Sequence, residues 1–154
     1  MEYGSIEREL HIDAAPEVVF EVVSSPEHIR EWWSAETDLQ PVPGATSELA
    51  WADEAGAQTM VVPITVVQAE RPRLFSFRWA YPGGEDATAA NSLLVTFELV
   101  PSGAGTVLRM TETGFREQGW EVAVLEAQYR EHVLGWDTHL AHLGEYLTRL
   151  VSTP

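Results

Sequence analysis

The chain has 154 residues, 45% of them hydrophobic and 21% charged, and this balance is typical of a single globular domain, here residues 1–154. Its formal net charge of -15 repels phosphate backbones and anionic lipid surfaces, which argues against nucleic-acid and membrane-surface binding. Because the sequence holds no cysteine, disulfides, thiolate nucleophiles and Cys-ligated metals are excluded.

The beginning of the sequence resembles no export signal. Its first residues, MEYGSIERELHID, are acidic and hold no apolar segment of the kind found in a signal peptide. No run in the chain approaches the roughly 18 apolar residues that a membrane span requires. We therefore expect a cytoplasmic protein.

The first part of the chain predicts one strand and two short helices. Residues 6–12 alternate apolar and polar side chains, the period of a half-buried strand, with Arg8 as a charged exception on the apolar side. Residues 13–25 predict a helix, because Asp13 can cap it, a proline suits its first turn and its apolar residues share one face. After the break at a second proline, residues 26–33 predict another short helix.

From residue 45 onward the apolar period changes to the two-residue period of strands. Each stretch places its large apolar side chains on one face. Joints rich in Gly, Pro and Asp separate the stretches, as hairpins require, so an antiparallel sheet is expected. Pro63 interrupts one strand, which is tolerated at a sheet edge or a bulge. The predicted strands are residues 46–53, 58–70, 73–81, 92–100 and 105–115.

The last part of the chain predicts one long helix. Between Val122 and Leu150, apolar residues recur at spacings of three and four and form a continuous stripe. Such a stripe must be covered by something broad and apolar, and the inner face of the sheet is large enough to cover it.

Four segments carry a family resemblance. APEVVFEVVSSPEHIREWW follows the first strand, VVQAERPRLFSFRW forms a strand pair, TETGF ends the last strand and GWDTHLAHLGEYL lies in the long helix. With these segments the chain resembles the START-like helix-grip (SRPBCC) superfamily, and within it the branch of homologues of the activator of the heat-shock-protein-ninety ATPase. The likeness extends from about Ile6 to Leu150.

The resemblance implies an α+β fold. A curved antiparallel sheet of about six strands would grip the long C-terminal helix, with two short helices after the first strand. It also implies a cavity between sheet and helix, which members of the superfamily use for lipids, polyketides and other apolar small molecules, some of them acting as cyclases. Fold alone does not decide function, because one fold carries many functions.

The adjacent tryptophans Trp32 and Trp33 raise a separate question, because neighbours on a regular helix point in different directions. In the implied fold the loop after the second short helix lies across the cavity mouth. We expect one indole to pack under that helix and the other, Trp33, to face the opening. The alternative is that both indoles are packing residues that pin a loop.

An aromatic cavity lining follows from the inward positions of the strands and the long helix. Such walls suit a flat or acyl ligand, whereas the alternative is an ordinary filled core. The predicted ligand-binding residues are Trp33, Trp51, Phe77, Trp79, Phe97, Met110, Tyr129 and Trp136.

Two polar residues are weak catalytic candidates. Glu112 shares the parity of the inward residues of its strand, so it points inward as an acid or a binding group, or else it is a wetted residue at the rim. His132 lies one turn before Trp136 and either faces the cavity or packs beside it. We expect Arg8 to pair with Glu112 in a structural ion pair.

No metal or cofactor is indicated. His139 and His142 lie three residues apart on the long helix, but no third ligand stands at a recognisable spacing, so they are expected on its solvated face. The chain also contains no GxSxG, no GxGxxG and no glycine-rich phosphate loop.

Three functions remain open. The preferred one is a carrier or sensor of an apolar, lipid- or polyketide-like small molecule. The second is a small enzyme of the cyclase or hydratase kind that acts in the same cavity through Glu112 or His132. The third is a co-chaperone-like protein-binding module, suggested by the family name. A homodimer is compatible with each of them.

Overall fold

A computed structural model describes residues 4–52 and 55–152 of the chain. Its centre is one antiparallel sheet of six strands in the order β1-β6-β5-β4-β3-β2. From β2 to β6, strands that follow one another in the chain are neighbours in the sheet, with a long loop of residues 80–92 between β4 and β5. β1 pairs with β6, which brings the first strand beside the last. The strands are β1 (Ser5–Ile12), β2 (Thr46–Ala52), β3 (Gln58–Glu70), β4 (Leu74–Trp79), β5 (Leu93–Ser102) and β6 (Gly105–Thr113).

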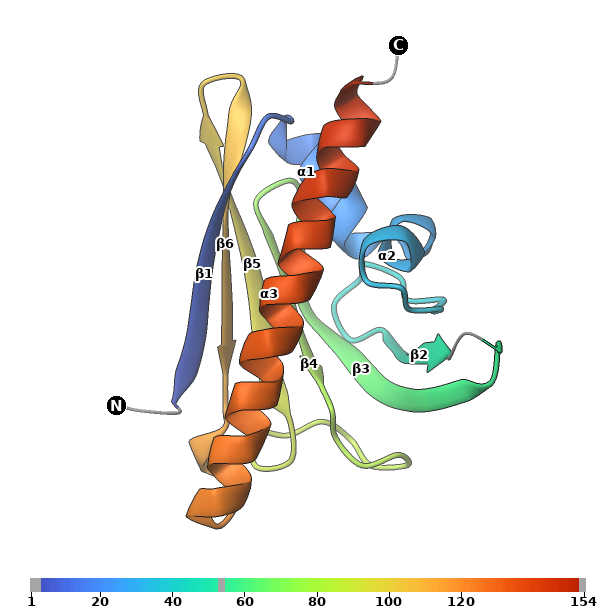
Figure 1. The fold of residues 1–154 in the computed structure, drawn as a ribbon, viewed down its shortest axis with the longest axis vertical. Helices are drawn as coiled ribbons and strands as arrows, with labels where there is room; N and C mark the ends of the chain where they lie inside the picture. The colour runs from blue at the N-terminus through green and yellow to red at the C-terminus, as the bar shows by residue number, and fades with distance from the viewer. Residues whose placement is uncertain (1–3, 53–54, 153–154) are drawn as a thin grey trace.

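The helices lie on one side of this sheet. The long helix α3 (Val122–Ser152) crosses the concave face (Figure 1). The short helix α2 (Pro26–Trp32) packs beside α3, and α1 (Pro16–Ser24) packs on α2 and on the sheet at β4 and β5. A single 3-10 turn, η1 (Arg116–Gln118), leads from β6 toward α3. The predicted α+β helix-grip architecture is therefore confirmed.

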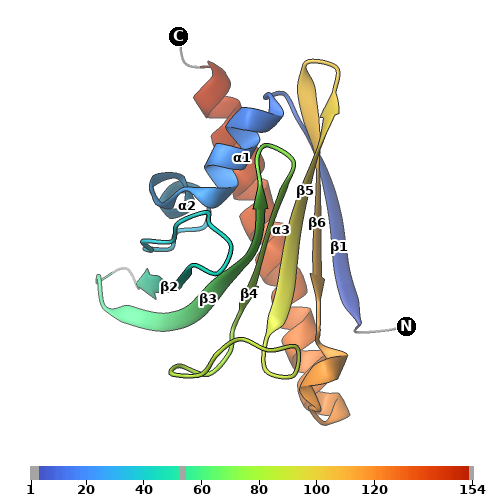
Figure 2. The ribbon, with the colours of Figure 1, turned by 180° about the vertical axis from the view of Figure 1, so that it is seen from behind.

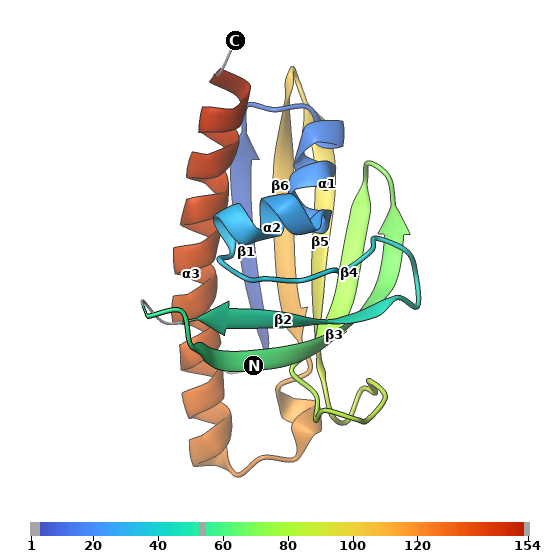
Figure 3. The ribbon, with the colours of Figure 1, turned by 90° about the vertical axis from the view of Figure 1, so that its right-hand side faces the viewer.

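The sheet curves strongly because the strands at one edge turn toward α3. Figure 3 shows β2 and β3 running across the molecule toward α3, whereas β5 and β6 run along it. The register of β3 against β4 shifts between Val66 and Gln68, and such irregularities bend a strand. On the opposite face of the sheet, seen in Figure 2, no described helix packs. The result is a bowl whose hollow side faces α3.

The core lies between the bowl and α3. Along β5 the residues alternate between buried and less buried, with Leu93, Val95, Phe97 and Leu99 on the inner face. The stripe of α3 supplies the other half, since Trp136, Leu140, Leu143 and Leu147 are all buried. Burial of these side chains, rather than helix propensity, is what holds α3 against the sheet.

The predicted strands and helices match the observed ones closely, with two differences. Asp13 does not cap the first helix, which begins at Pro16 after Ala15 and has no side-chain capping bond. Pro63 lies in β3 between two neighbouring strands and not at the predicted sheet edge: it pairs with Glu48 on β2, and its carbonyl accepts from Ala80 N–H just beyond the end of β4 at 3.2 Å. Residue 53, predicted as the end of a strand, lies outside the described residues.

Candidate functional site

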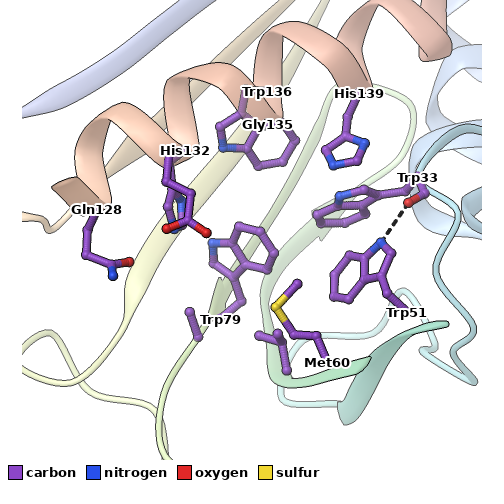
Figure 4. A pocket seen from close by; sticks show the side chains of 12 residues that line it. Trp33, Trp51, Met60, Trp79, Gln128, His132, Gly135, Trp136 and His139 are labelled. Atoms are coloured by element: carbon purple, nitrogen blue, oxygen red, sulfur yellow. Dashed lines mark hydrogen bonds between the residues drawn. The ribbon is translucent and has the colours of Figure 1, made fainter. Parts of the chain in front are cut away.

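A cavity of about 460 Å³ lies between the middle of α3 and the curved edge of the sheet. Its walls are mainly apolar, and Figure 4 shows the indoles of Trp33, Trp51, Trp79 and Trp136 gathered around it. Its volume falls within the range of roughly 300–1,000 Å³ that small-molecule sites occupy. It is lined by Trp33, Trp51, Met60, Val62, Trp79, Ala80, Gln128, Glu131, His132, Gly135, Trp136 and His139.

Three other indoles surround Trp33 at this cavity. The centroid of its ring lies 5.9 Å from that of Trp51, 5.3 Å from that of Trp79 and 5.4 Å from that of Trp136. The contacts are tilted or edge-to-face, which is the geometry that the aromatic quadrupole favours. Trp33 and Trp136 are almost fully buried, whereas Trp51 and Trp79 are partly exposed. The partly exposed pair supplies the aromatic surface of the cavity.

The end of α2 explains how both adjacent tryptophans enter the interior. The helix ends at Trp32, and after Trp33 the chain turns at Ser34, whose φ of 59° lies in the left-handed region. The two indoles stack with centroids 5.1 Å apart and an interplanar angle of 11°. Trp32 packs under α1 and donates to the carbonyl of Val22 at 2.9 Å, while Trp33 lines the cavity. Both indoles are thus buried. Trp33 lines the cavity, the position expected of the second indole, whereas Trp32 is bonded to the first short helix and not placed only under the second.

Residues 33–36, which follow α2, are hydrogen-bonded to the edge strand β2. Trp51 Nε1 donates to the carbonyl oxygen of Trp33 at 2.9 Å, as the dashed line in Figure 4 marks. Close by, Glu36 and Ala50 exchange two backbone hydrogen bonds. These bonds hold Trp51 in the cavity wall by its polar edge and leave its apolar surface free for contact.

Glu112 is a fully buried carboxylate at the inner end of the cavity. Its Oε2 accepts from Trp79 Nε1 at 2.7 Å, and its Oε1 accepts from Trp136 Nε1 at 2.8 Å. Oε1 also lies 2.9 Å from His132 Nδ1. Burying an isolated carboxylate is costly, and these three nitrogens on β4 and α3 satisfy it. Of the two predicted positions for Glu112, the inward one is therefore confirmed.

His132 joins this carboxylate to the cavity. Its side chain is 16% exposed and lies edge-on to Trp79 and Phe115. Nδ1 lies within hydrogen-bond distance of Glu112, whereas no hydrogen bond of Nε2 is found among the described residues. One ring nitrogen is thus held by the protein, and the other remains for a molecule in the cavity.

His139 is a second imidazole in the cavity wall, and its predicted place on the solvated face is wrong. It is half-buried beside Trp33, and its Nδ1 is a buried atom with no partner in the described part of the chain. Burial lowers the pKa of His139, and the nearby His142 lowers it further by charge repulsion. His142 itself is exposed, as predicted.

The predicted ion pair between Arg8 and Glu112 is wrong. Arg8 Nε donates to Asp137 Oδ1 on α3 at 2.7 Å, and its Nη1 donates to the carbonyl of Glu7. The hydrogen bond and the charge of Asp137 raise the pKa of Arg8. The long Arg8 side chain reaches the water-exposed edge of α3, where its charge needs less desolvation than it would beside Glu112.

Not every predicted ligand-binding residue reaches the cavity. Trp33, Trp51, Trp79 and Trp136 line it. Phe77, Phe97 and Met110 are buried in the core instead. Tyr129 packs on Phe115 and donates its hydroxyl to the carbonyl of Ser5. Strand parity separates inner from outer side chains, but it does not separate the cavity wall from the core behind it.

Several cavity residues were not predicted from the sequence. Met60 and Val62 share the inward parity of β3, and Ala80 follows the end of β4. On α3 the missed residues are Gln128, Glu131, Gly135 and His139, which share a face with His132 and Trp136 at spacings of three and four. That helical spacing is the signal that could have identified them.

The described residues include no group of three His, Cys, Asp or Glu side chains that could hold a metal ion. No helix in the described ranges is both long enough and apolar enough to cross a membrane. The polar side chains that line the cavity are Gln128, Glu131, His132 and His139.

Comparisons with known proteins agree with this architecture, although no curated protein sequence matches the chain. The solved structure of MLL2253 from Mesorhizobium loti is 26% identical, with 94% of this chain and 97% of that chain covered and a TM-score of 0.73. DynU16, a protein in the dynemicin biosynthetic locus, is 18% identical over 94% of this chain and 47% of its own, with a TM-score of 0.71.

A third similar structure is the Aha1 dimer from Colwellia psychrerythraea, with 17% identity over 93% of this chain and 95% of that chain and a TM-score of 0.67. The family model "Activator of Hsp90 ATPase homolog 1-like protein" matches residues 13–148, which include both short helices, five strands and nearly all of α3. The chain therefore belongs to the family of activator of Hsp90 ATPase homolog 1-like proteins.

Proposed function

We propose that the cavity between α3 and the sheet binds an apolar small molecule with a flat or aromatic part, and that the protein acts as its carrier or sensor. The observation that carries the proposal is the cavity of about 460 Å³ whose aromatic wall includes the partly exposed Trp51 and Trp79. Indole surface facing water is unfavourable, and a ligand that covers it gains the hydrophobic contribution of that area.

The absence of a side chain at Gly135 also supports ligand binding. Gly135 lies in the middle of α3 and lines the cavity, and a Cβ built there would meet no atom within 4 Å. A glycine inside a helix costs about 0.5–1 kcal/mol relative to alanine. The glycine does not allow any element to pack more closely here. We therefore infer that its role is to leave room for a ligand.

One of the comparisons fits a small-molecule role. DynU16 has the same fold and belongs to a biosynthetic locus. A biosynthetic locus encodes proteins for making a small molecule, whereas the family name refers to a protein partner. The partly exposed indoles of Trp51 and Trp79 favour a small-molecule ligand for this chain. A pocket of this shape takes up a compact molecule more readily than a protein surface.

Native mass spectrometry of freshly purified protein, followed by solvent extraction, tests the proposal. We expect an adduct that elutes as an apolar molecule. A titration with N-phenyl-1-naphthylamine, a neutral apolar fluorophore, supplies the second test, and its emission should rise to saturation as it enters the cavity.

The variant Gly135→Leu fills the cavity from α3 and should abolish this saturation, whereas Gly135→Ala adds one methyl group and should retain it. Equal fluorophore binding by both variants, together with a clean apo mass, would contradict the proposal.

We propose separately that the protein forms a homodimer. Two observations support this: the dimeric Aha1 structure has the same fold, and the apolar side chains of Val61 and Val67 on β3 are 43% and 40% exposed. Light scattering after size exclusion should give twice the chain mass of 17.1 kDa. A mass of one chain at every concentration tested would refute the dimer.

A further inference from the structure

The carboxylate of Glu112 is held more firmly than a simple packing role requires. Trp79 Nε1 and Trp136 Nε1 bind one oxygen each, from β4 and from α3, so the carboxylate cannot rotate. Indole nitrogens only donate, which means that both oxygens act as acceptors. A buried carboxylate that is fixed in this way can orient a third group that hydrogen-bonds to it.

The group that it orients is the imidazole of His132. Its Nδ1 lies 2.9 Å from Glu112 Oε1, the same oxygen that Trp136 occupies. Since that oxygen accepts, Nδ1 carries the proton and Nε2 keeps its lone pair. Edge contacts with Trp79 and Phe115 hold the plane of the ring.

The free nitrogen of His132 is on the side of the cavity. His132 lines the cavity, its side chain is partly exposed, and its hydrogen bond within the described residues is made by Nδ1 and not by Nε2. Figure 4 places this residue beside Trp79, at the end of the cavity where α3 passes over the sheet. A bound molecule that lies against Trp79 can therefore reach the lone pair.

We propose that His132, oriented by Glu112, is a general base that removes a proton from an apolar aromatic molecule bound in this cavity. The substrate class is a planar molecule with a weakly acidic C–H or O–H group. This inference rests on the proposed ligand binding and adds a reaction to it. His132 is the catalytic residue, and Glu112, Trp79 and Trp136 are positioning residues.

The step needs no further reactant. The substrate proton moves to Nε2 of His132, and the electron pair of the broken bond stays on the substrate. The carboxylate of Glu112 stabilises the imidazolium that forms. When the proton returns to another atom of the anion, the outcome is an isomerisation with all atoms and electrons conserved.

The tautomer of His132 can be measured without any ligand. Nuclear magnetic resonance of protein with 15N-labelled histidine distinguishes the two ring nitrogens by their shifts and couplings. We expect the proton on Nδ1 of His132 in the wild type and in Glu112→Gln, whose amide oxygen can still accept from Nδ1, and a loss of this preference in Glu112→Leu, which removes the acceptor. A wild-type His132 that carries its proton on Nε2 would overturn the proposal, because it would have no lone pair facing the cavity.

Turnover can be tested with 5-nitrobenzisoxazole, a planar bicyclic probe. A base takes its C3 proton, the electrons of the C–H bond form the third bond of a nitrile, and the ring N–O bond breaks with its electrons left on oxygen, which gives the coloured 2-cyano-4-nitrophenolate as the single product. We expect saturable acceleration over the same concentration of free imidazole. His132→Gln should lower kcat by roughly 100-fold or more, the usual contribution of a general base. Glu112→Gln should lower kcat more than it changes KM.

His142 supplies the control, since it is an exposed histidine on α3, and His142→Gln should keep the wild-type kcat. If the probe quenches tryptophan fluorescence to saturation but reacts no faster than with imidazole, the general base is refuted and ligand binding stands. If the probe does not bind at all, the result counts against the proposed ligand binding, and the tautomer of His132 then decides the inference.

Discussion

Replacing Glu112 by glutamine tests how the buried cluster contributes to stability. The change keeps the size of the side chain and turns one acceptor oxygen into an NH₂ donor. Glu112 Oε1 accepts from two groups and Oε2 from Trp79 alone, so the best amide orientation keeps its oxygen at the first position. The NH₂ group then faces Trp79 Nε1, donor against donor.

The expected loss can be worked from these bonds. A buried donor left without a partner costs about 1–3 kcal/mol, and the two bonds that remain become weaker because their acceptor is no longer charged. Together we expect Glu112→Gln to lower the free energy of unfolding by about 2–4 kcal/mol. In a domain of this size that corresponds to a fall in Tm of roughly 5–15 °C.

Urea unfolding followed by far-ultraviolet circular dichroism measures this loss, and a double-mutant cycle with Trp79→Phe assigns it. Trp79→Phe removes the indole donor that the amide leaves unpaired, so in that background Glu112→Gln should cost at least about 1 kcal/mol less. A glutamine variant as stable as the wild type would refute the reasoning, because the desolvation of the carboxylate would then outweigh its three hydrogen bonds.

Three further changes probe other parts of the fold. Gly135→Ala should raise the free energy of unfolding, measured by urea denaturation, by about 0.5–1 kcal/mol, because alanine has a higher helix propensity and its methyl group meets no atom. A less stable variant would mean that the cavity is not open at this point. Gly105→Ala should lower it by about 1–3 kcal/mol, because its Cβ would lie 2.4 Å from the carbonyl oxygen of Ile12, and wild-type stability would contradict this close approach. The lowered pKa of His139 means that the unfolded chain binds its proton more readily, so stability should fall as the pH drops below about 6.5, and the fall should be smaller in His139→Gln. Identical pH dependence in both proteins would show that burial and the charge of His142 do not act on this imidazole.

Much of the fold could be predicted because its elements have clear periods. The two-residue alternation in β5 and the helical stripe of α3 follow directly from which side chains are buried. Capping was less predictable: Asp13 has a suitable side chain, but Pro16 starts the helix after Ala15 without a side-chain bond. The residue at which a helix begins depends on contacts with neighbouring segments, and the local sequence pattern does not contain these contacts.

The candidate site was predictable only in part. Parity placed Glu112 inward, but its partners come from β4 and α3, and only the folded structure brings these elements together. Arg8 was assigned to it for the same reason, since parity gives the face of a strand and not the reach of a long side chain. His139 was missed because a helix position beside a stripe can face either water or a cavity, depending on how far the sheet curves.

The way α3 is supported has a consequence for how such proteins diversify. The backbone of α3 lies close to β1 and to α2, while over the middle of the bowl large side chains such as Trp136, Trp79 and Trp33 fill the distance between helix and sheet. The distance between α3 and the sheet is thus set by the contacts of α3 with β1 and α2, and the volume of the cavity is set by individual side chains. A single exchange of Trp51 or Met60 in the cavity wall can reshape the chamber while the strands keep their pairing. Related proteins with this fold can therefore change their ligand specificity through single substitutions in the cavity wall, while the domain stays folded at every step.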